Sequence, residues 1–187
     1  MSIDFQSLET KRLWLRPMLA KDLDFVFRHF SDPAISRYLV DEEPVSTMAQ
    51  AQEIIDFYAD PSSKSYNRWV LIRKSTDKPI GTCGFHMWQN SHHRAEIGYD
   101  LASAAWRQGY MTEALETVLR FGFEQMALNR ISAMVHPDNE ASLRLLTKLG
   151  FQKEGLLRDY YYQNGQFYDH WLLSLLKPKQ VAASATA

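Results

Sequence analysis

At residues 106–114 the chain reads Trp106-Arg107-Gln108-Gly109-Tyr110-Met111-Thr112-Glu113-Ala114. A strand pattern precedes this stretch over residues 94–101, and a long helical pattern follows it from Gly109 to about Ala127. The start of a helix exposes unpaired backbone N–H groups and carries partial positive charge. A glycine there lets a ligand come close to the backbone, so the turn is suited to an anion such as a pyrophosphate. On its own, Gly109 is more simply interpreted as an ordinary loop-to-helix turn.

The rest of the chain predicts an antiparallel front half, a β-α-β-α middle and a terminal hairpin. Alternating and continuous apolar patterns favour strands over residues 13–17, 68–72, 80–88, 94–101 and 130–135. Apolar residues at helical spacing favour further helices over residues 20–30, from Thr47 to about Tyr58, and up to Leu149. Thr47 followed three residues later by Gln50 fits a capping box, and Asn164-Gly165 is a strong hairpin signal.

Length and composition limit the class of protein. The chain has 187 residues, which is enough for one domain with a sizeable core and too few for two ordinary domains. Its net charge of −1 makes nucleic acid an unexpected partner, and the lone Cys83 excludes an internal disulfide. No apolar run is long enough to span a bilayer, and no secretory signal pattern begins the chain. We therefore expect a cytoplasmic protein without a membrane partner, with one domain over residues 1–178 and a loose tail over residues 179–187.

Several short motifs surround the central stretch in a fixed order. They are Thr10-Lys11-Arg12-Leu13-Trp14-Leu15-Arg16-Pro17 and Ala95-Glu96-Ile97-Gly98-Tyr99 before it, then Asn139-Glu140-Ala141-Ser142, Leu149-Gly150-Phe151 and Glu154-Gly155, and finally Asp169-His170-Trp171-Leu172-Leu173-Ser174-Leu175-Leu176-Lys177. This ordered set resembles the GNAT acyl-CoA N-acyltransferases. Within them it resembles the branch that contains RimJ and RimL, which acetylate ribosomal-protein N-termini. The resemblance runs from about Glu9 to Lys177.

The resemblance implies a fold and a cosubstrate. The fold is α/β of the α+β type, with about four helices and a mixed, mostly antiparallel sheet of six or seven strands. The sheet is splayed into a V between the strands at 94–101 and 130–135. Acetyl-CoA would lie in that V, with its pyrophosphate on the turn at 107–112 and its pantetheine arm beside the backbone near 99–101. The implied cofactor-binding residues are Tyr99, Asp100, Leu101, Arg107, Gln108, Gly109, Tyr110, Met111, Thr112, Asn139 and Ser142.

Direct attack of a neutral amine on a thioester needs a proton acceptor and a hydrogen-bond donor near the sulfur. Glu96 is the candidate base, because its strand should border the thioester; a solvated glutamate, or one paired with Arg94, is an equally open interpretation. The resemblance places Ser142 near the sulfur and Leu146 where many members carry a tyrosine acid. It also implies that Asn139 holds the pantetheine amide or a water. The plainer interpretation is that Asn139 is a helix cap and Ser142 a surface serine.

Three residues are candidates for contact with the acceptor, namely Trp69, His86 and Tyr161. Each also has a plainer interpretation. Trp69 fits a core residue, His86 a packed and hydrogen-bonded histidine, and Tyr161 a half-buried strand tyrosine. The pair His92-His93 has no further ligands at metal spacing, so no metal site is predicted.

The function predicted from the sequence is therefore acetyl-CoA-dependent N-acetylation, with the α-amino group of a protein or peptide as the best acceptor. The alternatives are acetylation of a small amine or an antibiotic, and a catalytically idle acyl-CoA-binding module. Turnover with any amine would distinguish the enzymes from the module. Exposed aromatic side chains would support a homodimer.

Overall fold

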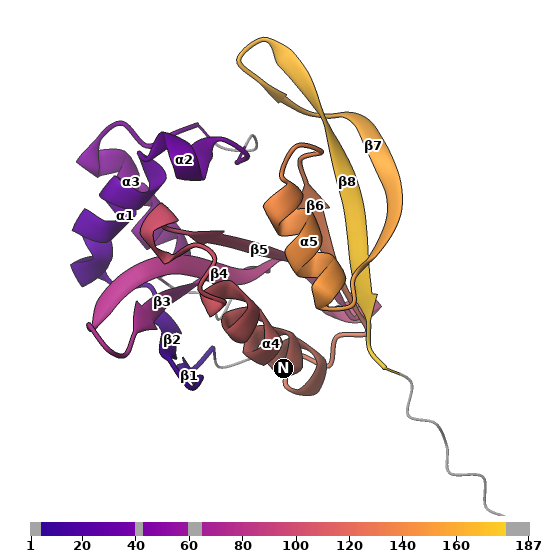
Figure 1. Ribbon diagram of the computed structural model, residues 1–187, viewed down its shortest axis with the longest axis horizontal. Helices are drawn as coiled ribbons and strands as arrows, with labels where there is room; N and C mark the ends of the chain where they lie inside the picture. Colours follow the sequence, from indigo (N-terminus) through magenta and orange to yellow (C-terminus); the bar gives the residue numbers. More distant parts are fainter. Residues whose placement is uncertain (1–4, 40–42, 60–64, 179–187) are drawn as a thin grey trace, which may run out of the picture.

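A single sheet runs through the molecule, in the strand order β1-β2-β3-β4-β5-β6-β8-β7 (Figure 1). The computed structural model describes residues 5–39, 43–59 and 65–178. The strands are β1 (Leu8–Glu9), β2 (Leu13–Pro17), β3 (Trp69–Arg73), β4 (Lys78–Gln89), β5 (Arg94–Leu101), β6 (Arg130–Val135), β7 (Gln152–Gln163) and β8 (Gln166–Leu176). The α-helices are α1 (Leu23–Phe30), α2 (Pro33–Ser36), α3 (Met48–Tyr58), α4 (Tyr110–Glu124) and α5 (Glu140–Lys148).

The predicted fold class is confirmed. Neighbouring strands pair antiparallel throughout the sheet, except for β5 and β6, which are parallel. The described part of the chain has eight strands instead of six or seven, because the two-residue strand β1 pairs with β2. The helix expected over residues 20–30 is divided into a 3-10 turn at Ala20–Asp22 and α1. The tail expected over residues 179–187 lies outside the described residues.

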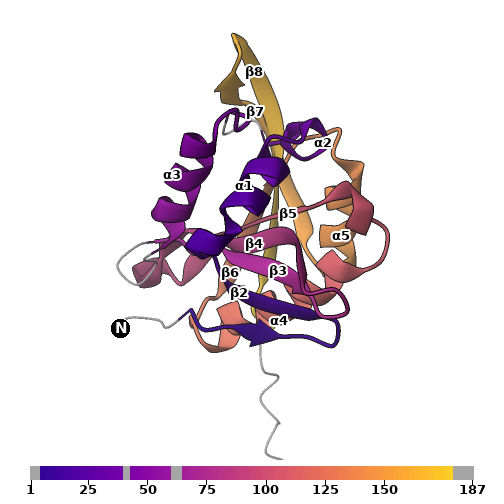
Figure 2. The same ribbon diagram turned by 90° about the vertical axis from the view of Figure 1, so that its left-hand side faces the viewer.

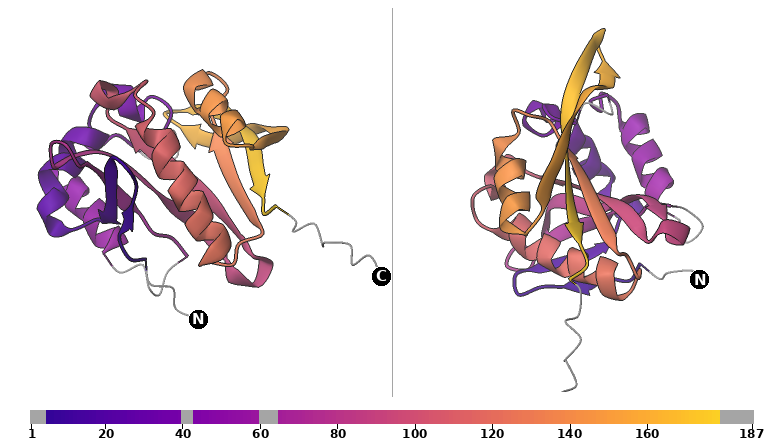
Figure 3. Two further views of the ribbon diagram at one scale, coloured as in Figure 1. Left: turned by 60° about the horizontal axis from the view of Figure 1, so that its bottom comes forward. Right: turned by 90° about the vertical axis from the view of Figure 1, so that its right-hand side faces the viewer.

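Helices cover both faces of the sheet. Figure 2 shows α1 and α3 in front of one face, and Figure 3 shows α4 lying along the other. Side chains of β3 point alternately to the two faces of the sheet and so contact both helix layers. Trp69 and Leu71 join the core under α4. Val70 and Ile72 join the core under α1 and α3. A strand buried on both faces is apolar at successive positions, as β3 is from Trp69 to Ile72.

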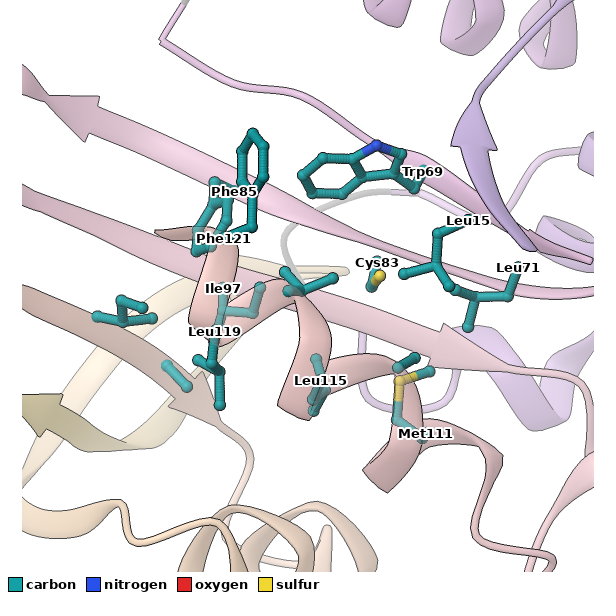
Figure 4. Close-up of a cluster of buried hydrophobic side chains, with 14 of the residues drawn as sticks. Leu15, Trp69, Leu71, Cys83, Phe85, Ile97, Met111, Leu115, Leu119 and Phe121 are labelled. Atoms are coloured by element: carbon teal, nitrogen blue, oxygen red, sulfur yellow. The ribbon is translucent and has the colours of Figure 1, made fainter. Parts of the chain in front are cut away.

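The larger core lies between the sheet and α4 (Figure 4). The Trp69 and Phe121 rings meet edge to face with their centroids 5.4 Å apart, and Phe85 packs beside them. Gly122 allows this close packing, because a Cβ at that position would lie 2.7 Å from Cζ of Phe85. The core fixes α4 against the sheet and, with it, the turn that precedes the helix.

The sheet opens between β5 and β6. Their parallel register has only three residue pairs, Arg94 with Arg130, Ala95 with Ile131 and Glu96 with Ser132. Beyond Glu96 the two strands diverge, while β5 continues to Leu101. This confirms the predicted splay and leaves the last five residues of β5 with a backbone edge that β6 does not pair.

Two local predictions are confirmed by backbone geometry. Thr47 Oγ1 accepts a hydrogen bond from the Gln50 N–H at 3.3 Å, while Gln50 Oε1 accepts from the Thr47 N–H at 3.1 Å, which is a capping box. Asn164 and Gly165 both have positive φ, at 52° and 77°, as a tight two-residue hairpin requires. The hairpin of β7 and β8 rises past α5 (Figure 1). None of the described helices combines the length and apolar character needed to cross a membrane.

Candidate active site

The turn before α4 has the backbone geometry of an anion site. Gly109 is the N-cap residue of α4 and has φ of +76°, and no side chain caps the helix. The N–H groups of Tyr110, Met111 and Thr112 therefore have no partner within the helix. Glycine is favoured at position 109 because an L side chain rarely adopts this φ. Arg107, at φ of +59°, is exposed on the same turn.

A clamp from the N-terminal strands holds this turn. The Arg12 guanidinium donates from Nε to Glu113 Oε2 at 2.6 Å and from Nη1 to the Gln108 carbonyl oxygen at 2.8 Å. It also lies 4.4 Å from the centre of the Tyr110 ring. Thr10 Oγ1 donates to Glu113 Oε1 at 2.6 Å. Sequence reasoning missed the clamp, because its two halves are about a hundred residues apart.

The predicted cofactor residues fall into two backbone segments that the fold brings together. Trp106 Nε1 donates to the Leu101 carbonyl oxygen at 2.6 Å, which ties the turn to the end of β5. Gln108 Nε2 donates to the Ala104 carbonyl oxygen and shapes the same loop. The side chains of Tyr110 and Met111 are buried in the core, so these two residues can offer only backbone groups to a ligand. Figure 4 shows Met111 among the core side chains.

On the α5 side of the sheet, two hydroxyl groups meet. The Tyr99 hydroxyl, from the part of β5 that β6 does not pair, lies 2.6 Å from Ser142 Oγ on α5. Burial raises the pKa of Tyr99 above its ordinary value, although the hydrogen bond to Ser142 lowers it in part. The phenol is therefore protonated at neutral pH. Leu146, one turn further along α5, is fully buried and has no proton to donate.

Asn139 lies directly beside this pair. Its Oδ1 accepts a hydrogen bond from the Ser142 N–H at 3.1 Å, so Asn139 caps α5, as its residue type favours. The amide nitrogen of the same side chain is a donor that the cap does not use. The cap therefore holds Ser142 at the start of α5 without excluding a second contact for Asn139.

The opposite face of β5 carries the predicted base. Side chains alternate along a strand, so Glu96, Gly98 and Asp100 face α1 and α3, while Tyr99 faces α5. Glu96 is half-buried and stands at the last residue pair before the strands diverge. The neighbouring Arg94 donates to Gln89 Oε1 at 2.9 Å. The two candidate catalytic groups therefore lie on different faces of the sheet, at the same opening.

The Asp100 side chain is held in an internal hydrogen-bond network, and the expectation for Asp100 concerns its backbone. One carboxylate oxygen accepts from His29 Nε2 at 2.5 Å and from the Thr82 N–H at 3.0 Å; the other accepts from Thr82 Oγ1 at 2.6 Å and from Arg68. Burial tends to raise the pKa of Asp100, but Arg68, His29 and Thr82 outweigh it and hold this pKa well below its usual range. Asp100 can therefore contribute only its backbone to a cofactor.

Two of the predicted acceptor contacts, Trp69 and His86, lie in different surroundings. Trp69 is fully buried under α4, with Nε1 donating to the Gln6 carbonyl oxygen at 3.0 Å, so it is a core residue out of reach of an acceptor. His86 lies on the same face as Glu96, with Nε2 3.3 Å from Arg68 Nη1. Burial, and then the Arg68 charge, lower the pKa of His86 to about 3, so its imidazole is neutral at physiological pH.

A group of aromatic side chains, here called the aromatic wall, lies on β7, β8 and neighbouring segments. It consists of Tyr38, His136, Tyr161, Tyr168 and His170, which meet through ring contacts of 4.7 to 5.9 Å between centroids. Of these residues, the sequence analysis had named only Tyr161 as an acceptor contact. The others come from the end of α2, the segment after β6, and β8. No local pattern could have found them, because segments far apart in the sequence build the wall.

The sheet register places the wall relative to the candidate base. Glu96 pairs with Ser132 on β6, and Ser132 pairs with Ser174 on β8. Paired residues share a face, and alternation along β8 then puts His170 on that face as well. The wall and Glu96 therefore border one side of the sheet. Among the described residues, no cluster of His, Cys, Asp or Glu side chains is arranged to hold a metal ion.

A splayed α/β sheet with an anion-binding turn beside the splay defines a class of CoA-dependent acyltransferases. Comparison with known proteins agrees with this class. The family described as an acetyltransferase (GNAT) domain matches residues 12–152. The chain is also 43% identical over 173 residues to the uncharacterized N-acetyltransferase p20 of Bacillus licheniformis, covering 92% of this chain and 97% of that protein. The chain belongs to the GNAT family and is an acetyl-CoA-dependent N-acetyltransferase.

Two further similarities bear on the acceptor. The chain is 36% identical over 100 residues to the [ribosomal protein uS5]-alanine N-acetyltransferase of Escherichia coli, covering 53% of this chain and 52% of that enzyme. A spermidine N-acetyltransferase from Vibrio cholerae, solved in complex with CoA and spermine, shares the fold with a TM-score of 0.78. Its sequence identity is 22%, and the match covers 88% of this chain and 95% of that one. The fold is therefore shared with enzymes of different acceptors.

Proposed function

We propose that this protein transfers an acetyl group from acetyl-CoA to the α-amino group at the N-terminus of a protein or peptide. The observation that carries the choice of acceptor is the aromatic wall on the face of the sheet that Glu96 shares. Two carboxylates lie on that face, and Arg68 and His29 already pair with one of them, Asp100. An α-amino group brings one positive charge to this face, whereas a polyamine brings several that each need a partner.

The residues present fit acetyl-CoA, which supplies an activated acetyl thioester. The free N–H groups at the start of α4 suit a pyrophosphate, and Arg107 adds a positive charge on the same turn. The backbone of Tyr99 to Leu101 offers an unpaired strand edge to the amides of an extended arm. Asn139 and Ser142 then stand beside the acyl end of that arm.

Glu96 removes a proton from the incoming amine, directly or through a water. An α-amino group has an ordinary pKa of about 7.7–8.0, so a useful fraction is neutral at pH 7 and a carboxylate base suffices. A lysine side chain, with a pKa near 10.4, makes a greater demand on the base. Ser142 Oγ donates a hydrogen bond to the departing sulfur from the other face of β5.

The aromatic wall contributes the acceptor side of the site. Its tyrosines and histidines present apolar rings with polar edges, which suit the backbone and small side chains of a peptide. The partial similarity to the [ribosomal protein uS5]-alanine N-acetyltransferase supports a protein acceptor.

The test is acceptor-dependent release of free CoA thiol. We expect release with peptides that have a free N-terminus. We expect far less with the same peptides blocked at the α-amine but containing lysine, and far less with spermidine. Glu96→Gln should lower kcat/KM by roughly 10²- to 10⁴-fold, the usual contribution of a general base. Glu116→Gln, on the exposed side of α4, is the matched control and should keep full activity.

Preferred turnover of spermidine or another small amine would contradict the proposed acceptor while leaving acetyl transfer intact. Full activity of Glu96→Gln would remove Glu96 from the base role and leave water as the proton acceptor.

A further inference from the structure

We propose that Tyr99 is a positioning residue for the transfer step: its hydroxyl orients the hydroxyl of Ser142 toward the thioester. The inference rests on the proposed function, because it gives Ser142 a partner in its contact with the departing sulfur. Tyr99 and Ser142 come from β5 and α5 and meet at 2.6 Å where the sheet has opened. Neither residue predicts the other in the sequence, because 43 positions separate them.

The direction of this hydrogen bond follows from the acidities of the two hydroxyl groups. A phenol, with an ordinary pKa of about 10, is a far better donor than an aliphatic alcohol. Burial raises the pKa of Tyr99 further, so the phenol keeps its proton at every pH at which the enzyme would work. In the proposed arrangement Tyr99 donates and Ser142 accepts across their 2.6 Å contact.

This direction has a consequence for Ser142. A serine hydroxyl has one proton and two lone pairs. When Tyr99 occupies a lone pair of Oγ, the serine proton is free to point away from Tyr99, toward a third group. A hydroxyl that accepts one hydrogen bond also becomes a stronger donor in the next. The pair thus forms a short chain from the Tyr99 hydroxyl through Ser142 to the sulfur, with no proton leaving Tyr99.

The surroundings hold both hydroxyl groups in place. Asn139 Oδ1 fixes the Ser142 N–H, which sets the position of Ser142 at the start of α5. On the other side, the Asp100 carboxylate anchors the neighbouring residue of β5 to His29, Arg68 and Thr82. The hydroxyl pair is therefore organised before substrate arrives, which is what a contact made only in the transition state requires. Leu146 has no hydroxyl, so α5 offers no tyrosine donor at that position.

The experiment is a double-mutant cycle of Tyr99→Phe and Ser142→Ala, read as kcat and as KM for acetyl-CoA. Tyr99→Phe removes one hydroxyl and keeps the ring. We expect kcat to fall about two- to tenfold, the equivalent of one hydrogen bond, with KM unchanged. In the Ser142→Ala background the same change should have almost no effect, because Tyr99 acts only through Ser142. Ser142→Thr, which restores a hydroxyl, should restore sensitivity to Tyr99→Phe.

Tyr66→Phe is the matched control. Tyr66 is half-buried and stacks on Phe57 with a centroid distance of 4.0 Å, in the part of the molecule around α3. Loss of its hydroxyl should leave kcat unchanged. Thermal unfolding of all variants, measured in parallel, separates a kinetic effect from a loss of stability.

Three results for Tyr99→Phe would overturn the inference. They are an unchanged kcat for Tyr99→Phe, a raised KM with unchanged kcat, and equal losses from Tyr99→Phe with and without Ser142. The proposed function fails differently, since the wild-type protein would then release no thiol with any N-terminal peptide. Full activity of Ser142→Ala would show that neither Ser142 nor Tyr99 acts in the transfer step. The proposed acetyl transfer would be unaffected by that result.

Discussion

Arg12 and Glu113, which are 101 residues apart in the chain, form an ion pair at 2.6 Å across the start of α4. The same guanidinium donates to the Gln108 carbonyl oxygen and covers the Tyr110 ring. The connection between β1 and β2 therefore holds the turn that we assign to the pyrophosphate.

Replacing Arg12 should weaken acetyl-CoA binding more than it slows chemistry. Arg12→Ala removes the contacts to Glu113, Gln108 and Tyr110 together, so the turn loses its preformed shape. We expect KM for acetyl-CoA to rise roughly tenfold with kcat within about twofold of wild type, as expected for loss of uniform binding. Arg12→Lys should rescue only partly, because an ammonium lacks the fork that contacts two acceptors. Arg28→Ala, at an exposed position on α1, is the control.

Gly109→Ala should raise KM for acetyl-CoA several-fold and lower stability by about 1 kcal/mol, because alanine is strained at φ of +76°. Gly155→Ala offers a matched comparison, since a Cβ there meets no atom within 4 Å. Calorimetric titration with CoA and denaturant unfolding measure the two effects separately. Equal behaviour of the two variants would show that the αL geometry at Gly109 is dispensable.

Asp100→Asn should destabilise the fold by about 3–5 kcal/mol, because it leaves the buried Arg68 charge without its partner. Glu140→Gln removes one member of an exposed pair with Arg144 and should cost less than about 1 kcal/mol. The pKa of Asp100 is lowered in the folded state, so its contribution is complete above the unfolded pKa and is lost as pH falls through the folded value. Urea unfolding at pH 7 and at acid pH tests both statements.

His86 should remain neutral well below the ordinary histidine range. Its pKa is lowered to about 3 by burial and by Arg68, whereas an unfolded histidine titrates near 6.5. The unfolded chain thus binds the extra proton between these values, and stability should fall as pH decreases from about 6.5 to 3. Imidazole nitrogen chemical shifts recorded through this range measure the titration directly. Protonation of His86 near pH 6.5 in the folded protein would contradict the burial argument.

Local features of the site could be predicted from the sequence because short-range physics determines them. Gly109 before a helical pattern, Thr47 with Gln50, and Asn164-Gly165 each specify a backbone conformation within a few residues. The alternation of β5 likewise separates Glu96 from Tyr99 before any contact is known. The family resemblance added the splay of the sheet, which the end of pairing at Glu96 confirms.

Only the tertiary structure decided what the side chains meet. Nothing in the sequence around Asp100 indicates its bonds to His29 and Arg68. His29 lies in α1, and Arg68 directly precedes β3. From the sequence, Trp69 fitted either a core residue or an acceptor contact. Its full burial in the core under α4 identifies it as a core residue. Tyr99 found Ser142 only because the sheet opens beside α5. Helix caps, turns and strand alternation depend on neighbours in the chain, and are therefore determined by the sequence itself. Burial and hydrogen-bond partners depend on which distant segments pack together, and that is decided only once the chain has folded.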